Sequence, residues 1–265
     1  MPDRLRRVAS PALRGLFGLL AKTTGASFSI EQTSAPLPAD GRPIIFAANH
    51  TNSEDIPRIV SALGRHTYVV VSSHPDPGTV NRAALNAYGT IWLRRGDKPG
   101  AKVSREAAQA SAVAKLRSGI DVLIFPEAVW MPRYSWIDGL PMLPFYQGTV
   151  NIARSAQAHL VPVVTEYTAD HVCHVTFCES FDYDRFGDDS IAATAELRAS
   201  MAAVKQAMRE VWGPSDEAAF MALRADWRKA LPALASATCL SIGKPHSQAG
   251  CASLARYRSM FDSIN

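Results

Sequence analysis

The chain has 265 residues, of which 47% are hydrophobic and 20% charged, and its formal net charge at pH 7 is +4. This composition predicts a folded globular protein and excludes a mainly disordered one. The small positive charge is far from the basic stripe of a nucleic-acid-binding protein, so we expect no nucleic acid partner. No apolar stretch approaches the length of about 20 residues that spans a bilayer.

The N-terminal segment, residues 1–26, is basic and apolar in alternation. Arginines and leucines between residues 4 and 20 follow a pattern typical of an amphipathic helix lying on a membrane surface. A first helix packed against its own domain would have the same composition. The segment has no convincing cleavage site, so we do not interpret it as a signal peptide.

Residues 27–189 predict an α/β domain with a mostly parallel central sheet flanked by helices, because short apolar runs alternate with helical segments. In chain order, we expect strands at 27–32 (an edge strand), 43–48, 67–72, 90–94, 121–125, 160–166 and 171–178, and helices at 53–63, 79–88, 102–117 and 149–158. Between them, residues 126–144 show no periodicity, as is typical of a functional loop.

The C-terminal part of the chain departs from this alternation. Two helices are expected at 191–211 and 216–231, which gives a C-terminal helical region at 190–235. The tail, residues 236–265, is rich in small residues and stays unassigned.

The cysteines give no sign of a metal site or a disulfide framework. Cys173, Cys178, Cys239 and Cys251 lack Cys-x-x-Cys and zinc-type spacing, which predicts reduced thiols in a cytoplasmic protein. The run 171–174 contains two histidines and a cysteine, but it alternates like a strand, so its neighbours point to opposite faces. We therefore expect no bound metal.

The strongest candidate site follows the strand at 43–48. That strand ends in Asn49 and His50, and Asp55 follows on the first turn of the next helix. A histidine at a strand end with a carboxylate close behind it suits a general base held by an acid. The spacing alone arises often by chance, so the pair needs support from other motifs.

Three more features lie at strand ends or within strands. Gly89 begins an apolar strand that runs to Arg95, and arginine binds phosphate well, although such a strand end is often simply solvated. Phe125, Pro126 and Glu127 close another strand, where an ordinary turn is the alternative. Pro162 interrupts an apolar strand, which predicts an edge strand or a bulge because proline lacks an N–H donor.

Together, and in this order, these motifs resemble those of the glycerophospholipid acyltransferase superfamily, the lysophospholipid acyltransferases. The resemblance covers residues 44–164. It matches the family's Asn-His-x4-Asp motif, its glycine–strand–arginine motif, its Phe-Pro-Glu motif and its proline-containing strand. It implies the acyltransferase fold. The matching residues are Asn49, His50, Asp55, Gly89, Arg95, Phe125, Pro126, Glu127 and Pro162.

The resemblance implies an O-acyltransferase that moves a fatty acyl group from acyl-CoA or acyl carrier protein to a lysophospholipid such as 1-acylglycerol-3-phosphate. His50 would take the hydroxyl proton and Asp55 would orient its ring. Arg95 would contact the phosphate of the acceptor, and Glu127 would shape that site. No cofactor or metal is implied, and the sequence has no Gly-x-Ser-x-Gly nucleophile motif.

One departure from the family pattern concerns the acceptor. Phe-Pro-Glu usually continues Gly-Thr-Arg, whereas here it continues Ala128-Val129-Trp130. Arg133 is the candidate to supply the missing cation. Another lysophospholipid, or an alcohol without phosphate, is therefore an alternative acceptor. A non-catalytic lipid-binding relative and a thioesterase are the alternative functions.

The resemblance also gives the basic N-terminal segment a use. An enzyme whose substrate stays in a bilayer benefits from a peripheral helix, so we expect residues 4–20 to contact the membrane. The expected location is cytoplasmic, on the inner face of the membrane.

Overall fold

The computed structural model describes residues 3, 11–12, 15, 29–50, 55–73, 79–94, 100–128, 142–167 and 172–212. Most of the predicted N-terminal helix over 4–20 lies outside these residues, as do the predicted helix over 216–231 and the tail. Within the described part of the chain, no helix has both the length and the apolar composition needed to cross a membrane.

The described chain alternates strands and helices, as predicted. The strands are β1 (Ser29–Ser34), β2 (Ile44–Ala48), β3 (Thr67–Ser72), β4 (Thr90–Leu93), β5 (Asp121–Ile124), β6 (His159–Tyr167) and β7 (Val172–Phe177). The helices are α2 (Asp55–Leu63), α3 (Thr79–Tyr88), α4 (Ala101–Arg117), α5 (Gly148–Ala156) and α6 (Ser190–Trp212), and a short 3-10 turn (Asp184–Phe186) precedes α6.

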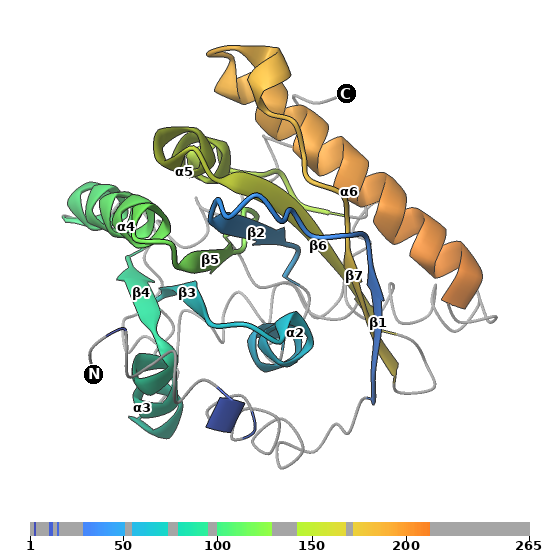
Figure 1. Ribbon diagram of the computed structural model, residues 1–265, viewed down its shortest axis with the longest axis horizontal. Helices are drawn as coiled ribbons and strands as arrows, with labels where there is room; N and C mark the ends of the chain where they lie inside the picture. The colour runs from blue at the N-terminus through green and yellow to red at the C-terminus, as the bar shows by residue number, and fades with distance from the viewer. Residues whose placement is uncertain are drawn as a thin grey trace, which may run out of the picture.

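The strands form one seven-stranded sheet in the order β1-β7-β6-β2-β5-β3-β4. Every pairing is parallel except that between β6 and β7. Helices α4, α5 and α6 cover one face of the sheet, and α2 and α3 cover the other (Figure 1). The mostly parallel α/β fold is therefore confirmed, and β1 is an edge strand as expected.

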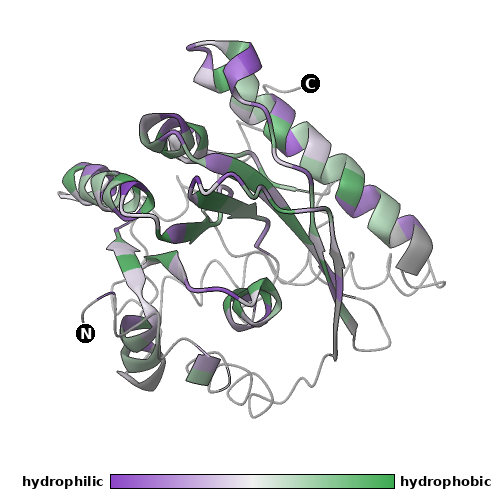
Figure 2. Cartoon of the chain, in the orientation of Figure 1, coloured by the Kyte–Doolittle hydropathy of each residue, from purple (hydrophilic) through white to green (hydrophobic). Residues whose placement is uncertain are grey.

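Strand β2 lies at the centre of both hydrophobic cores. Ile44 and Phe46 pack with the residues of α2 and α3, while Ile45 and Ala47 pack with those of α4, α5 and α6. All five residues of β2 are buried, and Figure 2 shows the central strands as largely hydrophobic. A strand buried on both faces reads as a continuous apolar run, which is why the sequence marked it clearly.

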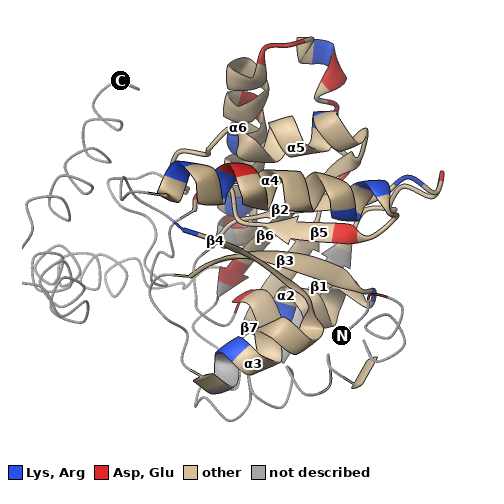
Figure 3. Ribbon diagram, turned by 90° about the vertical axis from the view of Figure 1, so that its left-hand side faces the viewer, with Lys and Arg blue, Asp and Glu red and all other residues tan. Residues whose placement is uncertain are grey.

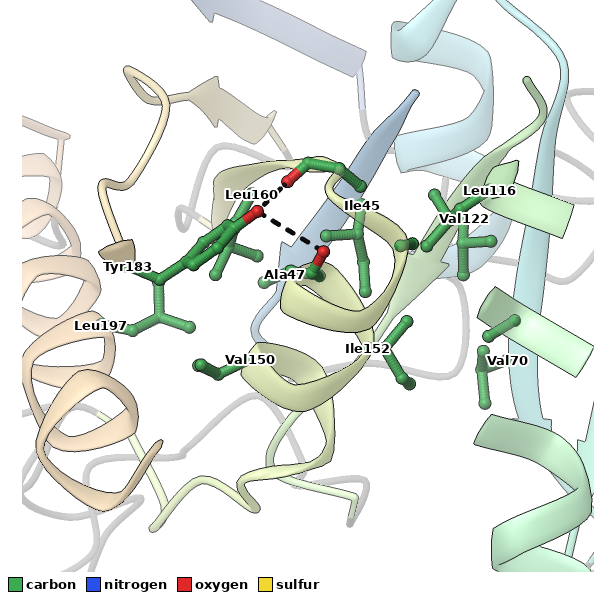
Figure 4. Close-up of a cluster of buried hydrophobic side chains, with 14 of the residues drawn as sticks. Ile45, Ala47, Val70, Leu116, Val122, Val150, Ile152, Leu160, Tyr183 and Leu197 are labelled. Atoms are coloured by element: carbon green, nitrogen blue, oxygen red, sulfur yellow. Dashed lines mark hydrogen bonds between the residues drawn. The ribbon is translucent and has the colours of Figure 1, made fainter. Parts of the chain in front are cut away.

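The core on the α4–α6 side includes a polar anchor (Figure 4). The Tyr183 hydroxyl donates to the carbonyl oxygen of Ala158 at 2.7 Å and lies 3.4 Å from that of Ala153. Burial raises the pKa of this hydroxyl above 10.0. The bonds attach the segment before α6 to the end of α5, so α6 starts from a fixed point.

Helix α6 packs on the sheet through an apolar stripe. Leu197, Met201 and Met208 are buried in the same core as β6 residues Leu160 and Val164. Charged residues are sparse in the central strands and more frequent on the helices (Figure 3). The predicted helix over 191–211 thus exists, and it is in close contact with the α/β sheet.

Of the two alternatives predicted for Pro162, an edge strand or a bulge, the edge strand is wrong, because β6 lies between β7 and β2. Pro162 sits where the β6–β7 ladder ends, just beyond the pair Val163 and Phe177. Its carbonyl still accepts the N–H of Cys178 at 2.9 Å, and the next bridge joins Leu160 to Phe181. The partner segment therefore carries one extra residue there, as in a β-bulge, which accommodates the missing donor.

Candidate active site

His50 lies immediately beyond the carboxyl end of β2, and Asp55 is the first residue of α2. Nδ1 of His50 lies 3.0 Å from Oδ2 of Asp55. The Asp55 side chain is fully buried, whereas 14% of the His50 side chain is exposed. The two residues of the predicted pair therefore lie within hydrogen-bond distance of each other.

This pair has the arrangement of a base with its orienting acid. A carboxylate on Nδ1 favours the tautomer with its proton on that nitrogen, which leaves the Nε2 lone pair of His50 available to accept a proton. The ring also stacks on Phe125, with centroids 4.3 Å apart and planes at 29°. Phe125 therefore limits rotation of the imidazole from one side.

Asn49 anchors the peptide just before the histidine. Its side-chain amide donates to the Thr165 carbonyl at 3.1 Å, and its Oδ1 accepts the Thr165 N–H at 2.7 Å. Asn49 is completely buried. The direct substrate contact predicted for Asn49 does not fit this burial, and its side chain instead fastens the end of β2 to β6.

Glu127 anchors the histidine from the other side. Its Oε1 accepts the backbone N–H of His50 at 2.8 Å, and its Oε2 accepts that of Leu143 at 2.9 Å. Burial raises the pKa of the Glu127 carboxyl, while the two N–H donors and the charge of Lys205 oppose that rise. Glu127 thus shapes the site by holding the backbone, and both of its oxygens are engaged in doing so.

Ala128 occupies the position where the family has glycine, and it has a φ of 52°. Its N–H donates to the Phe125 carbonyl at 3.0 Å, which closes a tight turn around Pro126 and Glu127. The carbonyl of Pro126 accepts the Tyr146 N–H at 2.9 Å. The chain therefore keeps the backbone shape that favours glycine, although an alanine there is strained.

Two predicted substrate residues, Gly89 and Pro162, occupy positions that the backbone itself explains. Gly89 lies at the amino end of β4, whereas His50 follows the carboxyl end of the parallel strand β2. Its φ of 129° and the Tyr68 ring, 3.1 Å from where a Cβ would stand, explain the glycine. Pro162 is buried within β6. The fold alone therefore accounts for both residues, and the substrate-binding roles of Gly89 and Pro162 stay predictions.

The predicted phosphate-binding arginines, Arg95 and Arg133, lie outside the described residues. Strand β4, which precedes Arg95, ends at Leu93 on the edge of the sheet. Two strands, β3 and β5, separate it from β2. Adjacent strands lie about 4.8 Å apart, so the end of β4 is roughly 14 Å from the end of β2.

Two basic residues of α6 support the site and were missed from the sequence. Arg198 donates to the carbonyls of Leu143 and Met142, at 3.0 and 2.8 Å. Lys205, which is 1% exposed, donates to the Thr165 carbonyl at 3.1 Å. A signal was present for Lys205, because it follows Met201 by four residues and precedes Met208 by three, on the apolar stripe of the helix.

The two basic residues of α6 lie close to two carboxylates in a largely buried region. Lys205 pairs with Glu166 at 3.1 Å. Burial lowers the pKa of the Arg198 guanidinium, and the negative charge of Glu127 opposes that change. Two cations and two carboxylates therefore share a region largely removed from water, where each needs the others.

Comparison with known proteins gives three findings. The family model described as Acyltransferase matches residues 29–166. No curated protein sequence matches the chain. The fold is similar to that of the 1-acyl-sn-glycerophosphate (LPA) acyltransferase PlsC from Thermotoga maritima, with a TM-score of 0.59 and 16% identity over 80% of this chain and 86% of that one.

Proposed function

Because the chain belongs to the acyltransferase family, we propose that it transfers a fatty acyl group from a thioester to the hydroxyl of a lysophospholipid, with His50 as the general base. Membership confirms the resemblance to the glycerophospholipid acyltransferase superfamily. The observation that carries the proposed mechanism is the contact of 3.0 Å between His50 Nδ1 and Asp55 Oδ2.

The reaction begins with the acceptor hydroxyl against Nε2 of His50. As the hydroxyl oxygen attacks the thioester carbonyl carbon, its proton passes to Nε2, and Asp55 stabilises the imidazolium that forms. The tetrahedral intermediate then collapses, the carbon–sulfur bond breaks, and the imidazolium returns the proton to the leaving thiolate. An ester and a free thiol result, and the histidine is neutral again.

The acceptor and the donor are assigned by similarity. The fold neighbour PlsC is named as a 1-acyl-sn-glycerophosphate acyltransferase, which supports a lysophospholipid such as 1-acylglycerol-3-phosphate. Arg95 and Arg133 would bind its phosphate, since guanidinium groups suit that oxyanion. Acyl-CoA or acyl carrier protein would donate the acyl group, with no further cofactor. Residues 4–20 would hold the enzyme on the inner face of the cytoplasmic membrane.

The turn at Ala128 supports catalysis over a silent lipid-binding role. The sequence has lost the glycine of the third motif, yet the backbone keeps a positive φ of 52° and Glu127 keeps its bond to His50. The part of the motif that supports the histidine is therefore intact.

The test is an acceptor panel. The purified full-length chain is incubated with acyl-CoA or acyl carrier protein and a set of lysophospholipids and simple alcohols, and lipid products are identified by mass spectrometry. We expect acylated lysophospholipid and an equal amount of free thiol. Thiol release without an acceptor would indicate a thioesterase. Vesicle binding with no thioester consumption across the panel would indicate a non-catalytic lipid-binding protein.

A further inference from the structure

The peptide of His50 is fixed at both ends by contacts that lead back to one helix. Glu127 holds the N–H of His50, and Asn49 holds the residue before it. Glu127 lies in the segment between β5 and α5, and Asn49 bonds to Thr165 of β6. A basic residue of α6 adds a further hydrogen bond to each of these two supports.

The first support runs through Arg198. Its Nε donates to the Leu143 carbonyl at 3.0 Å and its Nη2 donates to the Met142 carbonyl at 2.8 Å. The N–H of Leu143 in turn donates to Glu127, whose other oxygen holds His50. Arg198 thus fixes the backbone that presents one of the two donors to Glu127.

The second support runs through Lys205. Its Nζ lies 3.1 Å from the Thr165 carbonyl, and the Asn49 amide donates to the same carbonyl at 3.1 Å. The Thr165 N–H returns a bond of 2.7 Å to Asn49. Lys205 therefore locks the peptide of Thr165 in the orientation that Asn49 requires.

We infer that Arg198 and Lys205 are positioning residues for His50, although both lie outside the predicted motifs. The inference rests on the proposed function. Burying a lysine almost completely and an arginine by half lowers the stability of the fold unless hydrogen bonds and opposite charges compensate. Both residues act through backbone carbonyls, so neither touches the reacting atoms.

These contacts predict how substitutions of Arg198 change the kinetics of acyl transfer. Displacement of the His50 ring by about 1 Å misaligns Nε2 with the acceptor hydroxyl and lowers turnover by about 100-fold. We therefore expect Arg198→Ala to lower kcat by about 100-fold, with little change in KM for the lysophospholipid. Arg198→Lys should lose less, because lysine supplies a donor but cannot bridge two carbonyls as arginine does.

Lys205 needs a paired substitution. Lys205→Met alone would leave Glu166 as a buried charge without its cation, and the protein could unfold for that reason. Lys205→Met with Glu166→Gln removes both charges while it retains similar volumes. This double variant should fold and still lose kcat, because the Thr165 carbonyl has lost its donor from α6.

The matched control is Gln206→Ala, which alters an exposed residue next to Lys205 on the same helix. It should leave kcat unchanged. Thermal unfolding of each variant is measured, and all kinetics are run well below the lowest midpoint. An Arg198→Ala protein that folds and retains wild-type kcat would overturn the inference.

A second readout separates this inference from the proposed function. Nitrogen-15 NMR of the His50 imidazole reports the tautomer directly, without substrate. We expect one tautomer, protonated on Nδ1, in the wild type and a mixture in Arg198→Ala. If no acyl transfer is found with any acceptor, the proposed function fails, while a change in this spectrum still supports positioning. An unchanged spectrum in Arg198→Ala would overturn the positioning role inferred for Arg198.

Discussion

The backbone N–H of His50 donates a hydrogen bond of 2.8 Å to Glu127, which lies 77 residues further along the chain. The second oxygen of Glu127 accepts the N–H of Leu143. One buried carboxylate therefore joins the end of β2 to the chain that leads into α5. The acid of the third motif supports the histidine of the first through its main chain.

Replacement of Glu127 by glutamine should destabilise the protein at neutral pH. Glutamine offers one carbonyl oxygen, so one of the two N–H groups loses its acceptor. An unsatisfied buried donor costs about 1–3 kcal/mol. Urea unfolding of the wild type and the variant measures the difference, and equal unfolding midpoints would contradict the assigned bonds.

The same pair of proteins should differ in pH dependence. Burial raises the pKa of Glu127 above its ordinary value of 4.5. Between 4.5 and that higher value, the folded state binds more protons than the unfolded state, so the free energy of unfolding falls as pH rises through this window. The wild type should therefore lose stability relative to Glu127→Gln as pH is raised. A pH-independent difference would contradict the direction given for this pKa.

Replacement of Ala128 by glycine should stabilise the protein. A left-handed conformation costs an alanine about 1–2 kcal/mol, and glycine removes that cost. Glycine also gives the unfolded chain more conformational freedom, which lowers the free energy of unfolding by about 0.4–1 kcal/mol. The expected net increase in the free energy of unfolding is about 0.8 kcal/mol. The control is Ala114→Gly, on an exposed position of α4, which should lose about 1 kcal/mol. A destabilised Ala128→Gly protein would contradict the positive φ.

Replacement of Gly89 by alanine should lower stability and spare catalysis. Its φ of 129° disfavours any side chain, and the new Cβ would stand 3.1 Å from the Tyr68 ring. We expect a loss of about 1–3 kcal/mol. Denaturant unfolding measures that loss, and kcat is measured below the unfolding transition. Normal stability combined with a raised KM for the acceptor would contradict this expectation and support the substrate-binding role predicted for Gly89.

Cys178 should be slow to react with iodoacetamide in the folded protein. Burial raises the pKa of its thiol to about 11, and only the thiolate is nucleophilic. The alkylation rate, followed by mass spectrometry of the peptide, should rise steeply as the pH approaches 11. Fast alkylation at neutral pH would contradict the burial of this sulfur.

The sequence predicted the sheet well because its central strands are buried on both faces. Five consecutive buried residues in β2 give a signal that needs no knowledge of partners. The link between His50 and Asp55 was equally accessible, because a strand end and the next helical turn are close in the chain. Local chemistry was therefore readable from the sequence.

The supports of the histidine were not readable in this way. Asn49 and Thr165 are 116 residues apart, and the roles of Arg198 and Lys205 depend on backbone carbonyls that carry no residue identity. The sequence also left open whether Pro162 marks an edge strand or a bulge, because the effect of its missing N–H depends on where the neighbouring ladder ends. Contacts of this kind appear only once the chain is folded.

The central claim is that His50 accepts the hydroxyl proton during acyl transfer. The chain offers a matched comparison, because His159 also pairs with an aspartate, Asp40, at 2.9 Å, and lies beside the start of β2, opposite the end that His50 follows. Acceptor-dependent acyl transfer is measured for the wild type, His50→Ala and His159→Ala. We predict that His50→Ala loses about 100- to 10,000-fold in kcat while His159→Ala retains wild-type kcat. Undiminished transfer by His50→Ala would contradict the account.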